Sequence, residues 1–217
     1  MKVINLGESN SVLNTFVAQM RDKKIQKDSL RFRTNLRRTG EIFAYEISKT
    51  LHYSPREVVT PLATAQIPLC DDKIVLATIL RAGLPLHEGL LSFFDSAQNA
   101  FIAAYRKHDT AEQFNINPEY CTCPDLKGKT LIISDTMIAT GASILLAYNR
   151  LLEEGGEPAC THLVCPVSSA EAVDYLKKNL PKDTTLWTAA IDEELTGHSY
   201  VVPGLGDAGD LAFGTKL

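Results

Sequence analysis

The sequence predicts an α/β fold in which a central, mostly parallel sheet is flanked by helices. From Lys73 onward, short apolar runs rich in β-branched residues alternate with segments of helical periodicity, a pattern typical of parallel strands joined by crossover helices. These runs are apolar almost throughout, as strands covered on both faces should be. No internal repeat and no linker rich in Pro, Gly or Ser divides the 217 residues, so we expect a single domain over 1–217.

The first part of that domain, residues 1–70, is predicted to supply peripheral helices. Apolar residues recur at helical spacing over 12–20, after two polar residues that can cap a helix, and again over 32–47 after two more. The second segment also holds the most basic stretch of the chain, which we interpret as a solvated face. The first helix is carried by Val12, Leu13, Phe16, Val17 and Met20 behind Asn10 or Ser11, the second by Phe32, Leu36, Phe43 and Ile47 behind Asp28 or Ser29, and the basic stretch by Arg31, Arg33, Arg37 and Arg38.

Residues 73–191 are predicted to form the core sheet, and residues 192–217 a tail. The apolar runs expected to be strands are 74–80, 100–105, 130–134, 162–167 and 185–191. The segments expected to be helices between them are 84–94, 142–154 and 169–179.

Two local signals refine this core. Ser168 and Glu171 have the S-x-x-E spacing of a capping box at the start of the last helix. Residues 106–129 hold charges, Pro118, Pro124 and little periodicity, so they predict a long loop, and loops of that length are commonly functional.

Composition and charge exclude several classes of function. A net charge of −4 provides no basic field, so nucleic acid and membrane surfaces are not expected as partners. Five irregularly spaced cysteines, in a chain long enough to fold without disulfides, predict reduced thiols and a cytoplasmic location. The chain shows neither a signal-peptide pattern nor an apolar run long enough to span a membrane. The histidines and cysteines lack the spacing of a zinc site, and no nucleophile stands beside a base.

Candidate site residues follow the predicted strands, because in an open parallel sheet the ligand lies beyond the carboxyl ends of the strands. Segments 81–83, 106–107, 135–143 and the tail after Ile191 occupy such places. In 135–143 an acid ends an apolar strand, and a short loop then opens a helix. Backbone N–H groups and hydroxyls at a helix N-terminus can cradle a sugar phosphate, while Asp135 can accept hydrogen bonds from two sugar hydroxyls. Taken alone, the segment is equally compatible with a helix cap and turn without a ligand.

With two other stretches, this segment resembles the phosphoribosyl pyrophosphate motif of type I phosphoribosyltransferases, in the uracil phosphoribosyltransferase form with a single acid at the strand end. Residues 79–84, followed by Glu88 and Gly89, are similar to the pyrophosphate loop of that family. Residues 200–210, with 213–215 behind them, are similar to its uracil-binding tail. Weaker similarity around 31–33 and 45–46 extends the resemblance over nearly the whole chain.

The resemblance implies a type I phosphoribosyltransferase fold with a C-terminal hood for the base, and transfer of phosphoribosyl from phosphoribosyl pyrophosphate to uracil, giving UMP and pyrophosphate. It implies a cis peptide bond in the pyrophosphate loop, Mg²⁺ as cofactor, a homo-oligomer (dimer or tetramer) and GTP as a possible effector. The metal would be met indirectly by Asp207, through the bound phosphoribosyl pyrophosphate. The catalytic residues implied are Arg81, Arg106, Asp135 and Asp207; the phosphoribosyl pyrophosphate contacts are Arg81, Ala82, Gly83, Arg106, Asp135, Thr136, Met137, Ile138, Ala139, Thr140, Gly141, Ala142, Ser143 and Asp207; and the uracil contacts are Val201, Gly206, Asp207 and Ala208.

Two nucleotide-binding motifs can be set aside. Gly204, Gly206 and Gly209 form a G-x-G-x-x-G, but only eight residues follow Gly209, too few for the helix and second strand of a dinucleotide-binding unit. Residues 128–130 read Gly-Lys-Thr like the end of a P-loop, but a strand rather than a helix follows them.

Departures from the family pattern keep alternatives open. Thr136 stands for a usual Pro and Ala142 for a usual Gly, and 85–88 and 165–169 also differ. A Cβ at Ala142 could crowd the phosphate if that position needs a positive φ. One alternative is therefore a non-catalytic regulator that senses UMP or phosphoribosyl pyrophosphate on the same fold. Another is a transferase for a purine or a different base, which would need a stacking aromatic in the tail, where Tyr200 and Phe213 are available.

Overall fold

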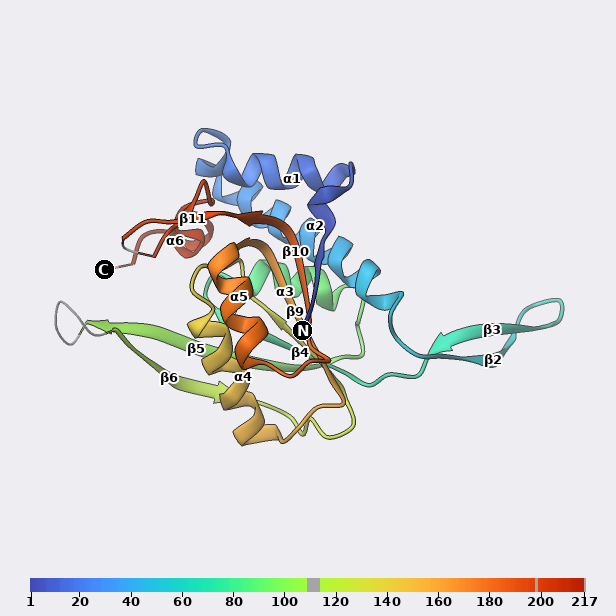
Figure 1. The fold of residues 1–217 in the computed structure, drawn as a ribbon. Coiled ribbons are helices and arrows are strands. Elements are labelled where there is room, and N and C mark those ends of the chain that lie inside the picture. The colour runs from blue at the N-terminus through green and yellow to red at the C-terminus, as the bar shows by residue number, and fades with distance from the viewer. Residues whose placement is uncertain (109–113, 198, 217) are drawn as a thin grey trace.

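An eight-stranded sheet forms the centre of the computed structural model, which describes residues 1–108, 114–197 and 199–216 (Figure 1). The strand order is β1-β10-β9-β7-β4-β5-β6, and β8 pairs with β9 beyond the end of β7. Every pairing in this sheet is parallel except that of β5 with β6. The bounds are β1 Lys2–Asn5, β4 Ile74–Leu80, β5 Gln98–His108, β6 Phe114–Thr122, β7 Thr130–Ser134, β8 Met137–Ile138, β9 Cys160–Ser169 and β10 Thr185–Asp192. The predicted mostly parallel sheet is confirmed.

Helices cover both faces of the sheet. On one face, α1 (Val12–Arg21), α2 (Ser29–Ser48) and α3 (Leu84–Leu91) share a buried apolar cluster with Leu76 of β4. On the other, α4 (Ala142–Gly155) and α5 (Ala170–Asn179) share a second cluster with Val75 and Ala77 of the same strand. Successive side chains of a strand point to opposite faces, so burial on both sides explains why the strand runs are apolar throughout.

The N-terminal region differs from the expected set of peripheral helices. β1 joins the central sheet beside β10, and α1 and α2 bury Leu13, Phe32 and Phe43 almost completely in the core. Strands β2 (Tyr53–Val59) and β3 (Thr64–Cys70) form a separate antiparallel hairpin that projects from the body (Figure 1). These strands escaped prediction because β1 has only four residues and the hairpin has no buried face that would produce a clear apolar pattern.

The prediction of a long loop over 106–129 was wrong. β5 continues to His108, and β6 returns antiparallel to it along the edge of the sheet. Pro118 lies within β6, and an edge strand tolerates a proline because one side of it needs no ladder hydrogen bonds. The resemblance also implies that the loop after Arg106 acts as a mobile cover, and the part of it at 109–113 lies outside the described residues.

Helix caps agree with the sequence signals except at α5. Ser11 and Asp28 cap α1 and α2. At α5 the cap is Ser169, whose Oγ accepts a hydrogen bond from the Ala172 N–H at 2.9 Å, whereas Ser168 still belongs to β9. The capping box was therefore placed one residue too early.

The remaining elements are short. No helix in the described part of the chain has the length and apolar character that crossing a bilayer requires. The bounds are η1 Leu6–Glu8, η2 Ile25–Lys27, β11 Glu194–Leu195, β12 Val201–Val202 and α6 Ala208–Phe213.

Candidate active site

The pyrophosphate-loop candidate and Asp135 follow neighbouring strands. Thr78 of β4 pairs with Ser134 of β7, and the Thr78 hydroxyl donates to the Ser134 carbonyl at 3.3 Å. A Cβ on Gly83 would lie 2.3 Å from Thr78 Oγ1, so only glycine lets this loop turn so close to the strand ends. The loop beginning at Arg81 and the acid at 135 therefore share one edge of the sheet.

The phosphate-loop candidate, residues 135–143, is fixed by its neighbours. β8 lies within this loop and pairs with β9, and the Ser169 hydroxyl donates to the Ala139 carbonyl. Gly141, with φ +82°, makes the left-handed turn into α4. Among the described residues Ser199 is the only non-glycine with a positive φ, so Ala142 does not have a positive φ. The crowding of the phosphate expected from a Cβ at a positive-φ position therefore does not apply to Ala142.

Asp135 has a strongly altered acidity. Burial raises its pKa to about 7, and hydrogen bonds from Thr136 and Met137 offset only part of this rise. The residue as a whole is only half-buried, but what matters is the desolvation of the carboxyl group, which disfavours its charged form. The Thr136 N–H donates to Asp135 Oδ1 at 2.7 Å. The carboxyl group thus changes charge close to neutral pH.

Arg81 connects the pyrophosphate loop to the tail. The peptide bond between Leu80 and Arg81 is cis, as the resemblance implies. The Arg81 guanidinium donates from Nη2 to Asp210 Oδ1 at 2.9 Å and from Nη1 to the Gly214 carbonyl at 3.1 Å. The Arg81 side chain is nevertheless 42% exposed. A guanidinium has five N–H donors, so donors remain for a phosphate group.

The tail forms a compact unit around α6. Asp207 caps this helix by accepting from the Asp210 N–H at 3.0 Å, and its other oxygen lies 3.7 Å from Lys216 Nζ. Of the residues predicted to contact uracil, Val201 and Ala208 are buried, whereas Gly206, with φ +85°, is exposed.

One arginine of the basic stretch also reaches this tail. Arg33 Nη1 donates to the Ala212 carbonyl at 2.6 Å, so for this residue the interpretation as a solvated face was wrong. The contact joins α2 to the last turn of α6 and helps to hold the tail against the body of the protein.

The structure brings most of the predicted site residues to one edge. Arg81, the 135–143 loop and the tail meet at the carboxyl ends of β4, β7 and β10. Arg106 lies in β5, next to β4, and its side chain is outside what the structure describes.

Sequence reasoning missed three further residues that support these groups: Asp210, which accepts from Arg81, Ser169, which donates to Ala139, and Asp192, which accepts from the Gly204 N–H of the tail. Asp192 ends β10, so applying the carboxyl-end rule to single residues would have found it. Ser169 was overlooked because the capping box was assigned to its neighbour.

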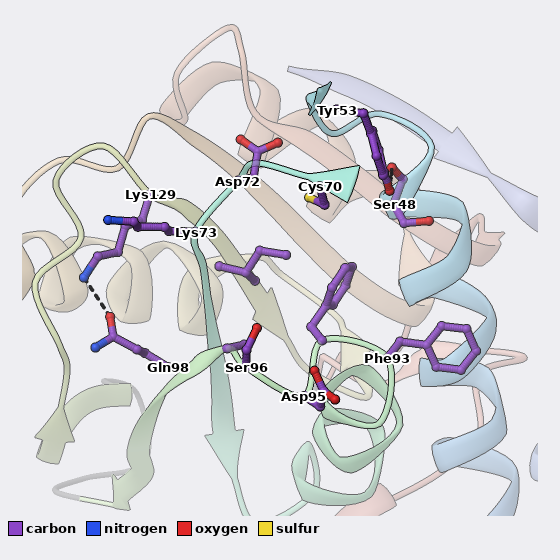
Figure 2. Close-up of a pocket in the computed structure, with 13 residues that line it drawn as sticks. Ser48, Tyr53, Cys70, Asp72, Lys73, Phe93, Asp95, Ser96, Gln98 and Lys129 are labelled. Carbon is purple, nitrogen blue, oxygen red and sulfur yellow. Dashed lines mark hydrogen bonds between the residues drawn. The ribbon is translucent and has the colours of Figure 1, made fainter. Parts of the chain in front are cut away.

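A pocket of about 620 Å³ lies away from this edge, at the amino ends of β4, β5 and β7 (Figure 2). Lys129 Nζ donates to Gln98 Oε1 at 2.7 Å on one side of it, and Tyr53 and Phe93 lie on the other. None of the predicted site residues lines it. Because ligands of open α/β sheets bind at the carboxyl ends, we place the active site at the opposite edge.

Asp207 is the residue that the resemblance implies would meet a magnesium ion, through bound phosphoribosyl pyrophosphate. No group of three or more His, Cys, Asp or Glu side chains within the described residues could hold a metal on its own. Mg²⁺ usually keeps several waters and binds one or two carboxylates together with substrate phosphates. The Asp207 side chain is 39% exposed, so this donor set fits an ion that arrives with a phosphate ligand.

Comparison with known proteins decides the family. The family model for uracil phosphoribosyltransferase matches residues 8–215. The chain belongs to the uracil phosphoribosyltransferase family. It is 54% identical to a uracil phosphoribosyltransferase of Porphyromonas gingivalis over 217 residues, which is 100% of both chains, and 38% identical to one of Caulobacter vibrioides over 212 residues, or 96% of this chain and 97% of the relative.

A solved structure from Aquifex aeolicus has the same fold. It superposes with a TM-score of 0.86 at 27% sequence identity, covering 99% of each chain. The predicted family, fold class and enzyme class are thus confirmed, and the comparisons give no support to the non-catalytic regulator.

Proposed function

We propose that the protein transfers the phosphoribosyl group from phosphoribosyl pyrophosphate to uracil and releases UMP and pyrophosphate. One observation carries the proposal: in a member of this family, the three motifs that would hold the ribose phosphate, the pyrophosphate and the base meet at one edge of the sheet. The fold alone would not specify a substrate. Adjacent sites for a ribose phosphate, a pyrophosphate and a base do specify one.

In the proposed reaction, the bond from the anomeric carbon to pyrophosphate breaks and a bond from that carbon to uracil N1 forms, while the N1 proton passes to the released pyrophosphate or to water. The sugar carries positive charge at the transition state, so positioning and electrostatics supply most of the rate. Asp135 would accept from the ribose hydroxyls, and the N–H groups of 140–143 would hold the 5-phosphate at the start of α4.

Arg81 has a double role in this proposal. Its remaining donors would hold the leaving pyrophosphate, while the contacts with Asp210 and Gly214 tie it to the base-binding tail. Arg106 would supply a second positive charge to the same leaving group.

Mg²⁺ is proposed as the cofactor. Bound with phosphoribosyl pyrophosphate, it would neutralise charge on the diphosphate. Asp207 would meet it through the partly exposed carboxylate described above, while also capping α6.

The proposal predicts that uracil alone among the natural bases supports rapid turnover. A pyrimidine edge presents donors and acceptors that a rigid backbone can match, and such a site rejects analogues without them. The measurement is pyrophosphate release from phosphoribosyl pyrophosphate and magnesium with each base in turn. Equal rates with hypoxanthine or guanine would favour the purine alternative, and no release with any base would reject the proposal.

We also propose that the chain is a homo-oligomer, a dimer or tetramer, in which the β2–β3 hairpin contacts a second copy. Val59 and Leu62 near its tip are 84% and 98% exposed, and Ile67 and Leu69 are exposed as well. The hairpin projects from the body of the protein (Figure 1). Exposed apolar side chains gathered on such an element favour a protein interface.

For the paired replacement of Val59 and Leu62 by Ser, we expect light scattering to show a mass reduced toward the 23.8 kDa of one chain. Val12→Ser is the matched control, because Val12 is 65% exposed on α1, away from the hairpin. A wild-type protein that is monomeric at all concentrations would contradict the proposal.

Two further elements of the proposal are the cellular location of the protein and its regulation by a nucleotide. The five free cysteines support a reducing compartment, so we propose a cytoplasmic location. GTP stays a proposed effector that rests on the family resemblance, and adding it to the same assay tests it.

A further inference from the structure

A buried acid at the end of β10 has no part in the reaction proposed above. Asp192 is the last residue of the strand and is only 8% exposed. Burying a carboxylate costs free energy unless it is paired and hydrogen-bonded, so its partners indicate why it is there.

Those partners come from opposite ends of the chain. Asp192 Oδ1 accepts from Arg21 Nη2 at 3.0 Å, and Asp192 Oδ2 accepts from the Gly204 N–H at 2.9 Å. Arg21 is the last residue of α1 and is 20% exposed. One carboxylate therefore joins the central sheet, the first helix and the tail.

The Gly204 end of this connection lies in a tight turn. Gly204 has φ +54°, and a Cβ there would lie 2.2 Å from the Val201 carbonyl oxygen. On either side of it, Val201 and Leu205 are 5% and 2% exposed and belong to the same apolar cluster as Leu13 and Met20 of α1. The turn thus shares a buried apolar cluster with the helix that also supplies Arg21.

This turn spans the residues proposed to read the base, from Val201 to Ala208. We propose that Asp192 is a positioning residue for uracil: held by Arg21, it fixes the Gly204 amide and thereby the backbone that the base would contact. The inference rests on the proposed function. A site that reads a flat base through backbone groups depends on their exact placement, because hydrogen bonds weaken steeply with misalignment.

The test is Asp192→Asn, which keeps the size but presents an amide N–H₂ to one of the two donors. We expect the KM for uracil to rise about tenfold, equivalent to about 1.4 kcal/mol. The KM for phosphoribosyl pyrophosphate and the kcat at saturating uracil should stay within about twofold, since the groups proposed to hold that substrate are not bonded to Asp192.

Two variants serve as controls. Glu193→Gln removes the same charge from the next, exposed residue and should change neither KM. Arg21→Lys keeps a cation beside Asp192 and should raise the uracil KM less than Arg21→Gln does.

The outcomes separate positioning from general stability. If both KM values rise together in Asp192→Asn, or if neither changes, the inference is overturned. If Asp192→Asn does not fold, Arg21→Gln tests the same ion pair at a less buried side chain. The quantity compared is again the change in the KM for uracil relative to the KM for phosphoribosyl pyrophosphate. Failure of the proposed function would appear differently, as wild-type protein that does not turn over uracil at all.

Discussion

We expect Arg81→Lys to bind pyrophosphate and phosphoribosyl pyrophosphate about 10- to 100-fold more weakly than the wild-type protein, while UMP binding stays within about twofold. Lysine keeps the charge but offers a point cation in place of a planar fork that can bond two phosphate oxygens. UMP lacks the diphosphate that leaves, so its affinity should be largely independent of this side chain. Calorimetric titration with each ligand separates the effects.

The contact of Arg81 with the tail makes a second comparison necessary. Arg81→Lys also loses at least one of the bonds to Asp210 and Gly214, which could disturb the base site without any effect on pyrophosphate. Asp210→Asn weakens that contact and leaves the guanidinium in place. If the two variants weaken UMP binding equally, the effect comes through the tail.

Arg150→Lys is the control for the substitution itself, because Arg150 pairs with Glu153 near the end of α4, outside the candidate site and the hairpin. If UMP affinity in Arg81→Lys drops as much as pyrophosphate affinity while Asp210→Asn has no effect, Arg81 is a structural or 5-phosphate residue. The pyrophosphate loop would then be misplaced.

Two of the central strands could be predicted from sequence to the residue. The runs at 74–80 and 130–134 coincide with β4 and β7, because burial on both faces makes a strand apolar from end to end and polar residues then mark its limits. Edge and projecting strands lack that double burial. β1, β6 and the β2–β3 hairpin therefore carried no readable pattern.

The motifs of the candidate site could be predicted from sequence, but the residues that hold those motifs in place could not. Asp135 and Arg81 stand in local patterns of strand, loop and helix, which a sequence displays directly. The partners of Asp192 are distant: 171 positions separate it from Arg21. Such a contact depends on how α1 folds across the sheet, which no local spacing encodes.

The second large effect is expected for Asp135→Asn. At pH 8 the kcat/KM for phosphoribosyl pyrophosphate should fall about 10- to 100-fold, because charge-assisted hydrogen bonds to the ribose hydroxyls become neutral ones worth about half as much. The pKa of about 7 adds a pH dependence. Near pH 5.5 most wild-type protein already carries a neutral carboxyl group, so there the two proteins should differ much less.

Whereas Asp135→Asn should lose activity as pH rises, its thermal stability relative to wild type should increase. The folded-state pKa of Asp135 lies above the ordinary value near 3.9, so the native protein holds a proton that the unfolded chain releases. Its contribution to stability is complete below about pH 4 and is lost as pH rises through about 7. An amide cannot ionise, so the melting temperature of Asp135→Asn relative to wild type should increase between pH 5 and pH 8.

The control is Asp174→Asn, a change of the same kind at a 71% exposed aspartate of α5. It should alter neither the kcat/KM nor the pH dependence of melting. An activity ratio between Asp135→Asn and wild type that stays constant from pH 5.5 to 8 would show that the carboxylate charge is not used on the substrate. If Asp135→Asn is more stable and less active than wild type in the same pH range, the buried Asp135 carboxylate destabilises the fold and is needed to bind the ribose hydroxyls.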